Sequence, residues 1–91
     1  MEPIMNVLFY TKPGCHLCED VEILLHNLQD VAPFTLEKRN ILSNDAWFDR
    51  YWNKIPVVVI EDGPTLYSPI RPVELRAAIL AAKNQTAPNI P

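Results

Sequence analysis

Two cysteines three residues apart, Cys15 and Cys18, are the residues of this 91-residue chain with the most distinctive chemistry, and the chain has no other cysteine. Two thiols at this spacing can cycle between a dithiol and a disulfide, or supply half of a zinc site. They follow an apolar run at residues 7–10 and open a segment with helical periodicity. If Cys15 is the N-cap or first residue of that helix, its sulfur lies beside unpaired backbone N–H groups, which favour the thiolate.

The positions of the two thiols predict different roles for them. Lys12 adds positive charge near Cys15, and His16 adds more when it is protonated. The acidic residues that follow at once oppose this effect, but solvent screens them, so we expect a moderately lowered pKa for Cys15. Cys18 lies about one turn further into the helix and should be more buried. The sequence therefore predicts that Cys15 attacks a disulfide and that Cys18 resolves the mixed disulfide.

The sequence disfavours two other interpretations of the pair. A structural zinc site needs four nitrogen or sulfur ligands, and His16 and His26 are the only additional candidates of that kind. His26 lies eight residues beyond Cys18, about 12 Å along a helix, which is too far for one mononuclear site. A pair of inert structural thiols is disfavoured by the strand–turn–helix context, which is typical of a redox motif. We therefore expect no metal ligands within the chain.

The elements that must position the cysteines follow from hydrophobic periodicity and from turn residues. The pattern predicts strands at residues 5–10, 34–39, 57–60 and 65–67, and helices at 16–30, 44–52 and 72–83. Ser43 is the predicted N-cap of the second helix. The first two strands should be parallel through a right-handed crossover, and the last two should form an antiparallel hairpin. The predicted α/β fold, in the order β-α-β-α-β-β-α, has a small four-stranded mixed sheet with helices on both faces.

Two sets of apolar residues at helical spacing are predicted to face the core. The first is a stripe on the helix that starts after Cys15, made of Leu17, Val21, Leu24, Leu25 and Leu28. The second set consists of Trp47, Phe48, Tyr51 and Trp52. Core packing is the favoured interpretation of these aromatic residues, and exposure of both tryptophans would instead indicate a partner surface.

Size and charge bound the remaining possibilities. We expect one domain at residues 1–83 and a flexible tail at residues 84–91. The net charge of −3 gives no support for binding nucleic acid or an anionic membrane. The first residues lack the pattern of a secretory signal, and no stretch is apolar enough for a membrane span. The predicted location is therefore the cytoplasm, where a close cysteine pair is more often redox-active or metal-binding than structural.

Two segments of the chain resemble the glutaredoxin branch of the thioredoxin superfamily, especially the short glutaredoxin-like proteins of bacteria. The first segment is residues 8–18, Leu-Phe-Tyr-Thr-Lys-Pro-Gly-Cys-His-Leu-Cys, and the second is residues 51–58, Tyr-Trp-Asn-Lys-Ile-Pro-Val-Val. The resemblance extends over about residues 5–83. It implies a thioredoxin-like fold and a redox-active disulfide that serves cell redox homeostasis and electron transport.

The resemblance also implies a substrate groove next to the cysteine pair. In such proteins the proline matching Pro56 is cis and lies against the cysteines, so the Ile55 backbone can pair with an extended substrate. We place Tyr10, Ser68 and Arg71 in the same groove. Residues 67–72 lack the Gly-Gly pair with which related proteins hold glutathione, so the resemblance does not carry glutathione binding with it.

The sequence thus predicts a glutaredoxin-like thiol–disulfide oxidoreductase that needs no organic cofactor, with glutathione left open as a co-substrate. Its expected partners are a protein or small-molecule disulfide and a reductant not identified from the sequence, and the expected state is a monomer. Two alternatives stay open. One is an iron–sulfur cluster or metal carrier that bridges a dimer through Cys15. The other is a redox-inactive binding module on the same fold.

Overall fold

The structure is a computed structural model that describes residues 5–61 and 63–86 of the chain. Its elements follow one another as β1 (Met5–Thr11), α1 (His16–Leu28), β2 (Phe34–Asn40), a 3-10 turn (Ile41–Ser43), α2 (Asp45–Tyr51), β3 (Val57–Ile60), β4 (Thr65–Tyr67) and α3 (Pro72–Thr86). Every strand and helix expected from the sequence is present. The predicted α/β fold with the order β-α-β-α-β-β-α is therefore confirmed.

The four strands form one mixed sheet in the order β2-β1-β3-β4. β1 runs parallel to β2, with Met5 opposite Phe34 at one end and Thr11 opposite Asn40 at the other. β3 is antiparallel to both β1 and β4. The parallel first pair and the antiparallel last pair are thus as predicted. The central strand β1 leads directly into the loop that carries the cysteines, so the sheet fixes where that loop begins.

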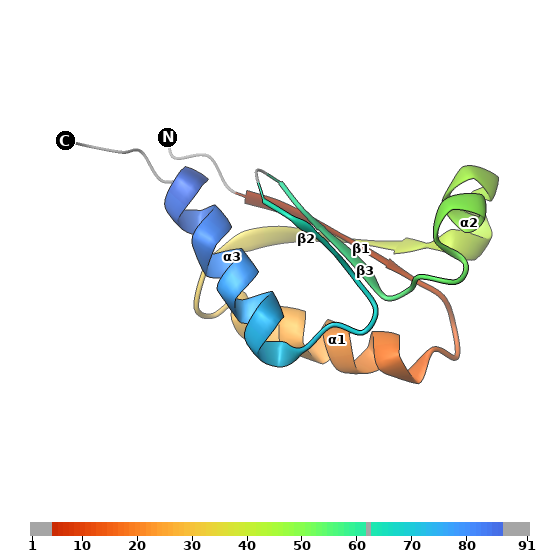
Figure 1. Cartoon of the computed structure of the whole chain (residues 1–91), viewed down its shortest axis with the longest axis horizontal. Helices are drawn as coiled ribbons and strands as arrows, with labels where there is room; N and C mark the ends of the chain where they lie inside the picture. The colour runs from red at the N-terminus through yellow and green to blue at the C-terminus, as the bar shows by residue number, and fades with distance from the viewer. Residues whose placement is uncertain (1–4, 62, 87–91) are drawn as a thin grey trace.

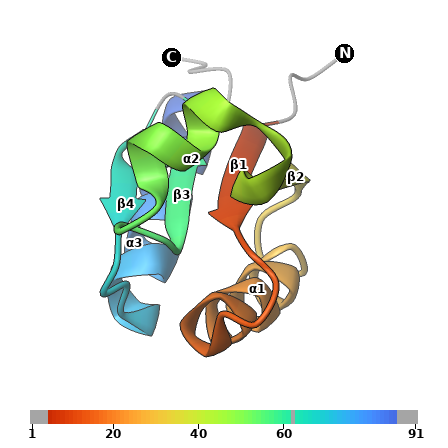
Figure 2. The same ribbon diagram turned by 90° about the vertical axis from the view of Figure 1, so that its right-hand side faces the viewer.

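Helices lie on both faces of the sheet (Figures 1 and 2). Both views show α1 and α3 side by side on one face and the short α2 on the other, at one end of the strands. The larger core fills the space between the sheet and the pair α1 and α3, and its fully buried members include Phe9, Leu25 and Ile79. A second, smaller core lies under α2 around Tyr10 and Tyr51. Alternation along β1 sends Phe9 to the first core and Tyr10 to the second.

The helices differ from the prediction by one to three residues at several ends, and one predicted cap is wrong. Ser43 does not cap α2, because it closes the preceding 3-10 turn, where its hydroxyl donates to the Asn40 carbonyl at 2.6 Å. Asn44 is the cap instead: its backbone is extended and its side-chain oxygen accepts from the Trp47 amide at 3.1 Å. The last helix ends at Thr86 rather than at Lys83. The rest of the predicted tail, residues 87–91, lies outside the described residues.

The two predicted apolar sets are each only partly buried. On α1, the residues from Val21 onward pack into the core as predicted, but Leu17 is 61% exposed and Cys18 takes the buried position in the first turn. On α2, Tyr51 is buried and Trp47 packs against the second core, whereas Phe48 and the C-cap residue Trp52 are exposed. A short helix at one end of the sheet covers too little area to bury all its aromatic residues, so the core prediction is wrong for Phe48 and Trp52.

None of the helices in the described part of the chain has the length and apolar content that a membrane span requires.

Candidate functional site

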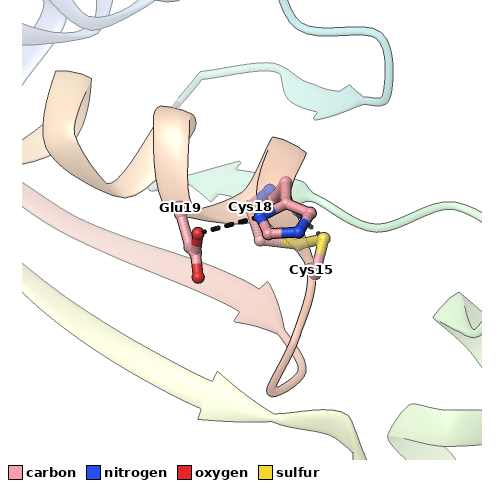
Figure 3. Close-up of polar contacts among 4 residues, drawn as sticks. Cys15, Cys18 and Glu19 are labelled. Carbon is pink, nitrogen blue, oxygen red and sulfur yellow. Dashed lines mark hydrogen bonds and ion pairs between the residues drawn. A yellow bond between two sulfur atoms is a disulfide. The ribbon is translucent and has the colours of Figure 1, made fainter.

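The cysteine pair lies at the start of α1, directly after the loop that leaves β1 (Figure 3). Gly14 turns this loop with a φ of +79°, a left-handed conformation that favours glycine. Cys15 is the N-cap of α1, as expected, with φ −92° and ψ 102°. Its sulfur forms a disulfide with Cys18, and their Cα atoms are 5.2 Å apart. The site is therefore a disulfide built into a helix start.

The two sulfurs have different surroundings. Cys15 is half-buried, whereas Cys18 is 1% exposed and belongs to the larger core. The Cys18 amide donates to the Cys15 sulfur at 3.2 Å, which is the side-chain capping bond of α1. A thiol approaching from solvent can therefore reach Cys15 but not Cys18. The predicted greater burial of Cys18 is confirmed.

Two residues close to Cys15 in sequence, Lys12 and His16, can carry positive charge. Lys12 is exposed and makes no hydrogen bond or ion pair with the other described residues. The His16 side chain is 92% exposed, and its Nδ1 lies 3.3 Å from the Glu19 carboxylate. That carboxylate offsets a positive charge on the imidazole. Of the two predicted tuning residues, His16 is thus paired with a carboxylate and Lys12 is unpaired among the described residues, and their effect on Cys15 stays a prediction.

The segment around Pro56 lies beside the cysteine pair. The Ile55–Pro56 peptide bond is cis, as the family resemblance implied, and Pro56 is buried. Pro56 and Ser68 line a pocket of about 230 Å³ together with Leu17, the residue between the two cysteines. The Ser68–Pro69 bond is also cis, which the sequence did not predict. Two of the predicted groove residues, Pro56 and Ser68, therefore share one pocket next to the disulfide.

The other predicted groove residues, Tyr10, Ile55 and Arg71, do not line this pocket. Ile55 is half-buried and packs against both cores, and Arg71 is exposed where the chain enters α3. Tyr10 corrects the prediction most clearly, because it is 5% exposed and packs under α2 against Tyr51, with ring centroids 4.4 Å apart. Its position on β1 sends its side chain to the face opposite α1. Tyr10 therefore belongs to the second core and does not line an open groove.

Tyr10 also anchors a polar cluster at the edge of this second core. Its hydroxyl accepts a hydrogen bond from Arg39 at 2.8 Å, and the same guanidinium lies 4.9 Å from the ring of Trp47. Arg39 forms a further hydrogen bond and ion pair with Glu37. The bond to Glu37, together with the weaker contributions of Tyr10, raises the pKa of Arg39 above its ordinary value. The cluster joins β1, β2 and α2.

Sequence reasoning missed the residues that complete the pocket beside the disulfide. They are Asp20 on α1 and Pro69 and Ile70 in the connection between β4 and α3. A signal was present on α1, where Leu17, Asp20 and Leu24 follow the helical spacing that brings side chains to one face. The connecting segment carried no periodicity, so its approach to α1 could not be foreseen. Among the described residues, no group of three or more His, Cys, Asp and Glu side chains is arranged to hold a metal ion.

Comparisons with known proteins agree on one family. The family model described as "Glutaredoxin-like domain (DUF836)" matches residues 6–80. The glutaredoxin-like protein YDR286C homolog of Dictyostelium discoideum is 35% identical over 63 residues. That match covers 63% of this chain and 58% of the relative, so the chain spans less than two thirds of that protein's length.

Solved structures share the fold. The solution structure of protein Ne2328 from Nitrosomonas europaea has a TM-score of 0.68 and 26% identity, over 85% of this chain and 93% of that one. The X-ray structure of protein XcR50 from X. campestris has a TM-score of 0.66 and 24% identity, over 78% of this chain and 91% of that one. The predicted thioredoxin-like architecture is therefore confirmed.

Proposed function

The chain belongs to the family of glutaredoxin-like domains, and from this premise we propose that it is a thiol–disulfide oxidoreductase with Cys15 as the nucleophile and Cys18 as the resolving thiol. The observation that carries the proposal is the asymmetry of the pair. The accessible sulfur caps a helix and accepts an amide hydrogen bond, whereas the other sulfur is buried beneath it. Donors that touch a sulfur favour its thiolate, which is the nucleophilic form.

The reaction of the reduced protein then has two steps. The Cys15 thiolate attacks one sulfur of a substrate disulfide, the substrate S–S bond breaks, and the first substrate thiolate leaves and takes up a proton. The Cys18 thiol next loses its proton and attacks the Cys15 sulfur, which releases the second substrate thiol. The substrate gains two electrons, and the protein is left with the Cys15–Cys18 disulfide.

The electrons travel on the cysteines themselves, so the reaction calls for no organic cofactor. A thiol or dithiol of another molecule must return the protein to its reduced form, by the same exchange run in the opposite direction. Cys18 needs no access to solvent in either direction, because its only reaction partner is the Cys15 sulfur. Its burial in the larger core is therefore compatible with repeated turnover.

Equilibration with defined thiol–disulfide buffers tests the proposal. When each mixture is acid-quenched and unfolded before alkylation, the two thiols should become alkylatable together as the buffer becomes more reducing, with one midpoint and a two-electron slope. Cys18→Ser should accumulate a mixed disulfide with a small probe disulfide, whereas Cys15→Ser should not, because its remaining thiol is buried. A pair that forms no reversible disulfide at any accessible potential, or a Cys15→Ser variant that still reduces the probe, would overturn the assignment.

A further inference from the structure

A pocket of about 230 Å³ lies beside the disulfide, between the N-terminal half of α1 and the connection from β4 to α3. Leu17, between the two cysteines, forms one wall, and Pro56 and Ile70 contribute to the other. Of the residues that line it, only Asp20 and Ser68 are polar. A group attached to a sulfur that reacts with Cys15 would therefore meet a mainly apolar surface.

The apolar surface continues from this pocket along the seam between α1 and α3. A second depression of about 300 Å³ follows it, and Leu24 and Pro72 line both. Val31 and Val73 extend the second depression, and Val73 is 80% exposed. Asn27 and Arg76 are its polar lining residues, and they lie at the part of the surface that is farther from the disulfide pocket. Both ribbon views show α1 and α3 next to one another on the same face of the sheet. The two depressions together form a mainly apolar seam that leads away from the disulfide and offers more space than one side chain fills.

The pocket is poorly suited to glutathione, whose two carboxylates and single ammonium give it a net negative charge. A carboxylate needs a cation or free N–H groups, and the pocket supplies few. The Ser68 amide already donates to the Lys54 carbonyl at 3.2 Å, and Pro56, Pro69 and Pro72 have no N–H. The one charged lining residue, Asp20, repels an anion.

We propose that this seam binds apolar side chains that flank the disulfide-bonded cysteine of a polypeptide substrate, and that glutathione disulfide is a poor substrate in comparison. The inference rests on the proposed oxidoreductase function and names its substrate class. The seam is mainly apolar and continues beyond the first pocket, which favours a polypeptide with apolar side chains. The negative charge of Asp20 disfavours an anionic group in the first pocket. In each turnover one peptide disulfide is reduced to two peptide thiols, and the Cys15–Cys18 dithiol is oxidised.

Three probe disulfides test the inference with the full-length, reduced protein. They are the oxidised dimers of acetyl-Leu-Cys-Leu-amide and acetyl-Ser-Cys-Ser-amide, and glutathione disulfide. Rate constants come from acid-quenched mixtures analysed by mass spectrometry. The leucine peptide should react about tenfold faster than the serine peptide, as expected when leucine side chains leave water. Glutathione disulfide should be the slowest of the three.

Two matched variants test whether the pocket causes the preference for leucine, and a third variant tests the charge of Asp20. Leu17→Gln should reduce the ratio of the leucine rate to the serine rate about threefold, because it removes one wall of the pocket. Ile23→Gln is the control: Ile23 is on the same helix and is 60% exposed, almost the same as Leu17, but lines neither depression. Asp20→Asn should raise the rate with glutathione disulfide about twofold by removing a repulsive charge.

The outcomes separate the two proposals. Equal rates with all three probes would refute substrate binding at the seam and leave the oxidoreductase function in place. An equal loss of the leucine preference in Leu17→Gln and Ile23→Gln would do the same. A faster reaction with glutathione disulfide than with the leucine peptide would refute binding at the seam as well. A protein that reduces none of the probes would overturn the proposed function and, with it, the inferred substrate class.

Discussion

Replacement of Tyr10 by phenylalanine distinguishes a structural residue from a substrate-contacting one. The variant keeps the ring that packs under α2 and removes only the hydroxyl that accepts from Arg39 at 2.8 Å. Because Tyr10 is buried on the face opposite α1, we expect a loss of stability and an unchanged rate of disulfide reduction. A residue that lined the substrate groove would give the reverse.

The size of the loss follows from the surroundings of the guanidinium. A hydrogen bond to a charged group contributes about 1.5–3 kcal/mol when its partner cannot be replaced. The Arg39 side chain is 25% exposed and keeps its bond to Glu37, so water can take over part of the lost interaction. We therefore expect a free energy of unfolding lower by about 1 kcal/mol, which for a domain of this size corresponds to about 5 °C in melting temperature.

Urea denaturation followed by circular dichroism measures the loss, and the rate with a probe disulfide measures the activity. Tyr67→Phe is the matched control, because Tyr67 is exposed on β4 and its hydroxyl can hydrogen-bond to water in the folded and unfolded states. The raised pKa of Arg39 keeps the guanidinium charged, so the loss should be the same at neutral and mildly alkaline pH. A Tyr10→Phe variant with unchanged stability and a several-fold slower reaction would refute the reasoning.

Three further changes test other parts of the structure. Gly63→Ala should lower the free energy of unfolding by about 1–2 kcal/mol, because the added methyl group would lie 3.1 Å from the side chain of Ala82 on α3. An unchanged midpoint in urea titrations would contradict this steric contact. Asn44→Ala should cost about 1 kcal/mol through loss of the helix cap, and Asn44→Ser should restore most of it. Lys12→Gln should raise the pKa of the Cys15 thiol and slow its alkylation at neutral pH about twofold, and an unchanged thiolate titration would remove Lys12 from the mechanism.

The overall fold could be predicted from the sequence because its strong signals are local. The apolar run of β3 and the helical spacing on α1 each specify an element without help from the rest of the chain. Chain order then leaves few arrangements for a parallel pair and a hairpin. The N-cap position of Cys15 also followed from local pattern, as did the burial of Cys18 one turn later.

The features that could not be predicted depend on tertiary contacts between elements that are distant in the sequence. Ser43 and Asn44 are both good caps, and only the 3-10 turn before them decides which one is used. Leu17 fits the apolar stripe of α1, but it lies at the helix start, where no other element covers it. Tyr10 adjoins the loop to the cysteines in sequence, and strand alternation turns it to the other face. The pocket residues after β4 carry no pattern at all.

The capping hydrogen bond of α1 makes the Cys18 amide sensitive to the chemical state of the Cys15 sulfur. The Cys18 amide donates to the sulfur that would exchange electrons, so its proton senses whether that sulfur is a thiolate, part of the internal disulfide or joined to another molecule. The thiolate presents a negative charge to this N–H group, whereas the two disulfide states present a neutral sulfur that is bonded to different partners. The nuclear magnetic resonance signal of this one amide should therefore distinguish all three states without any label attached to the cysteines.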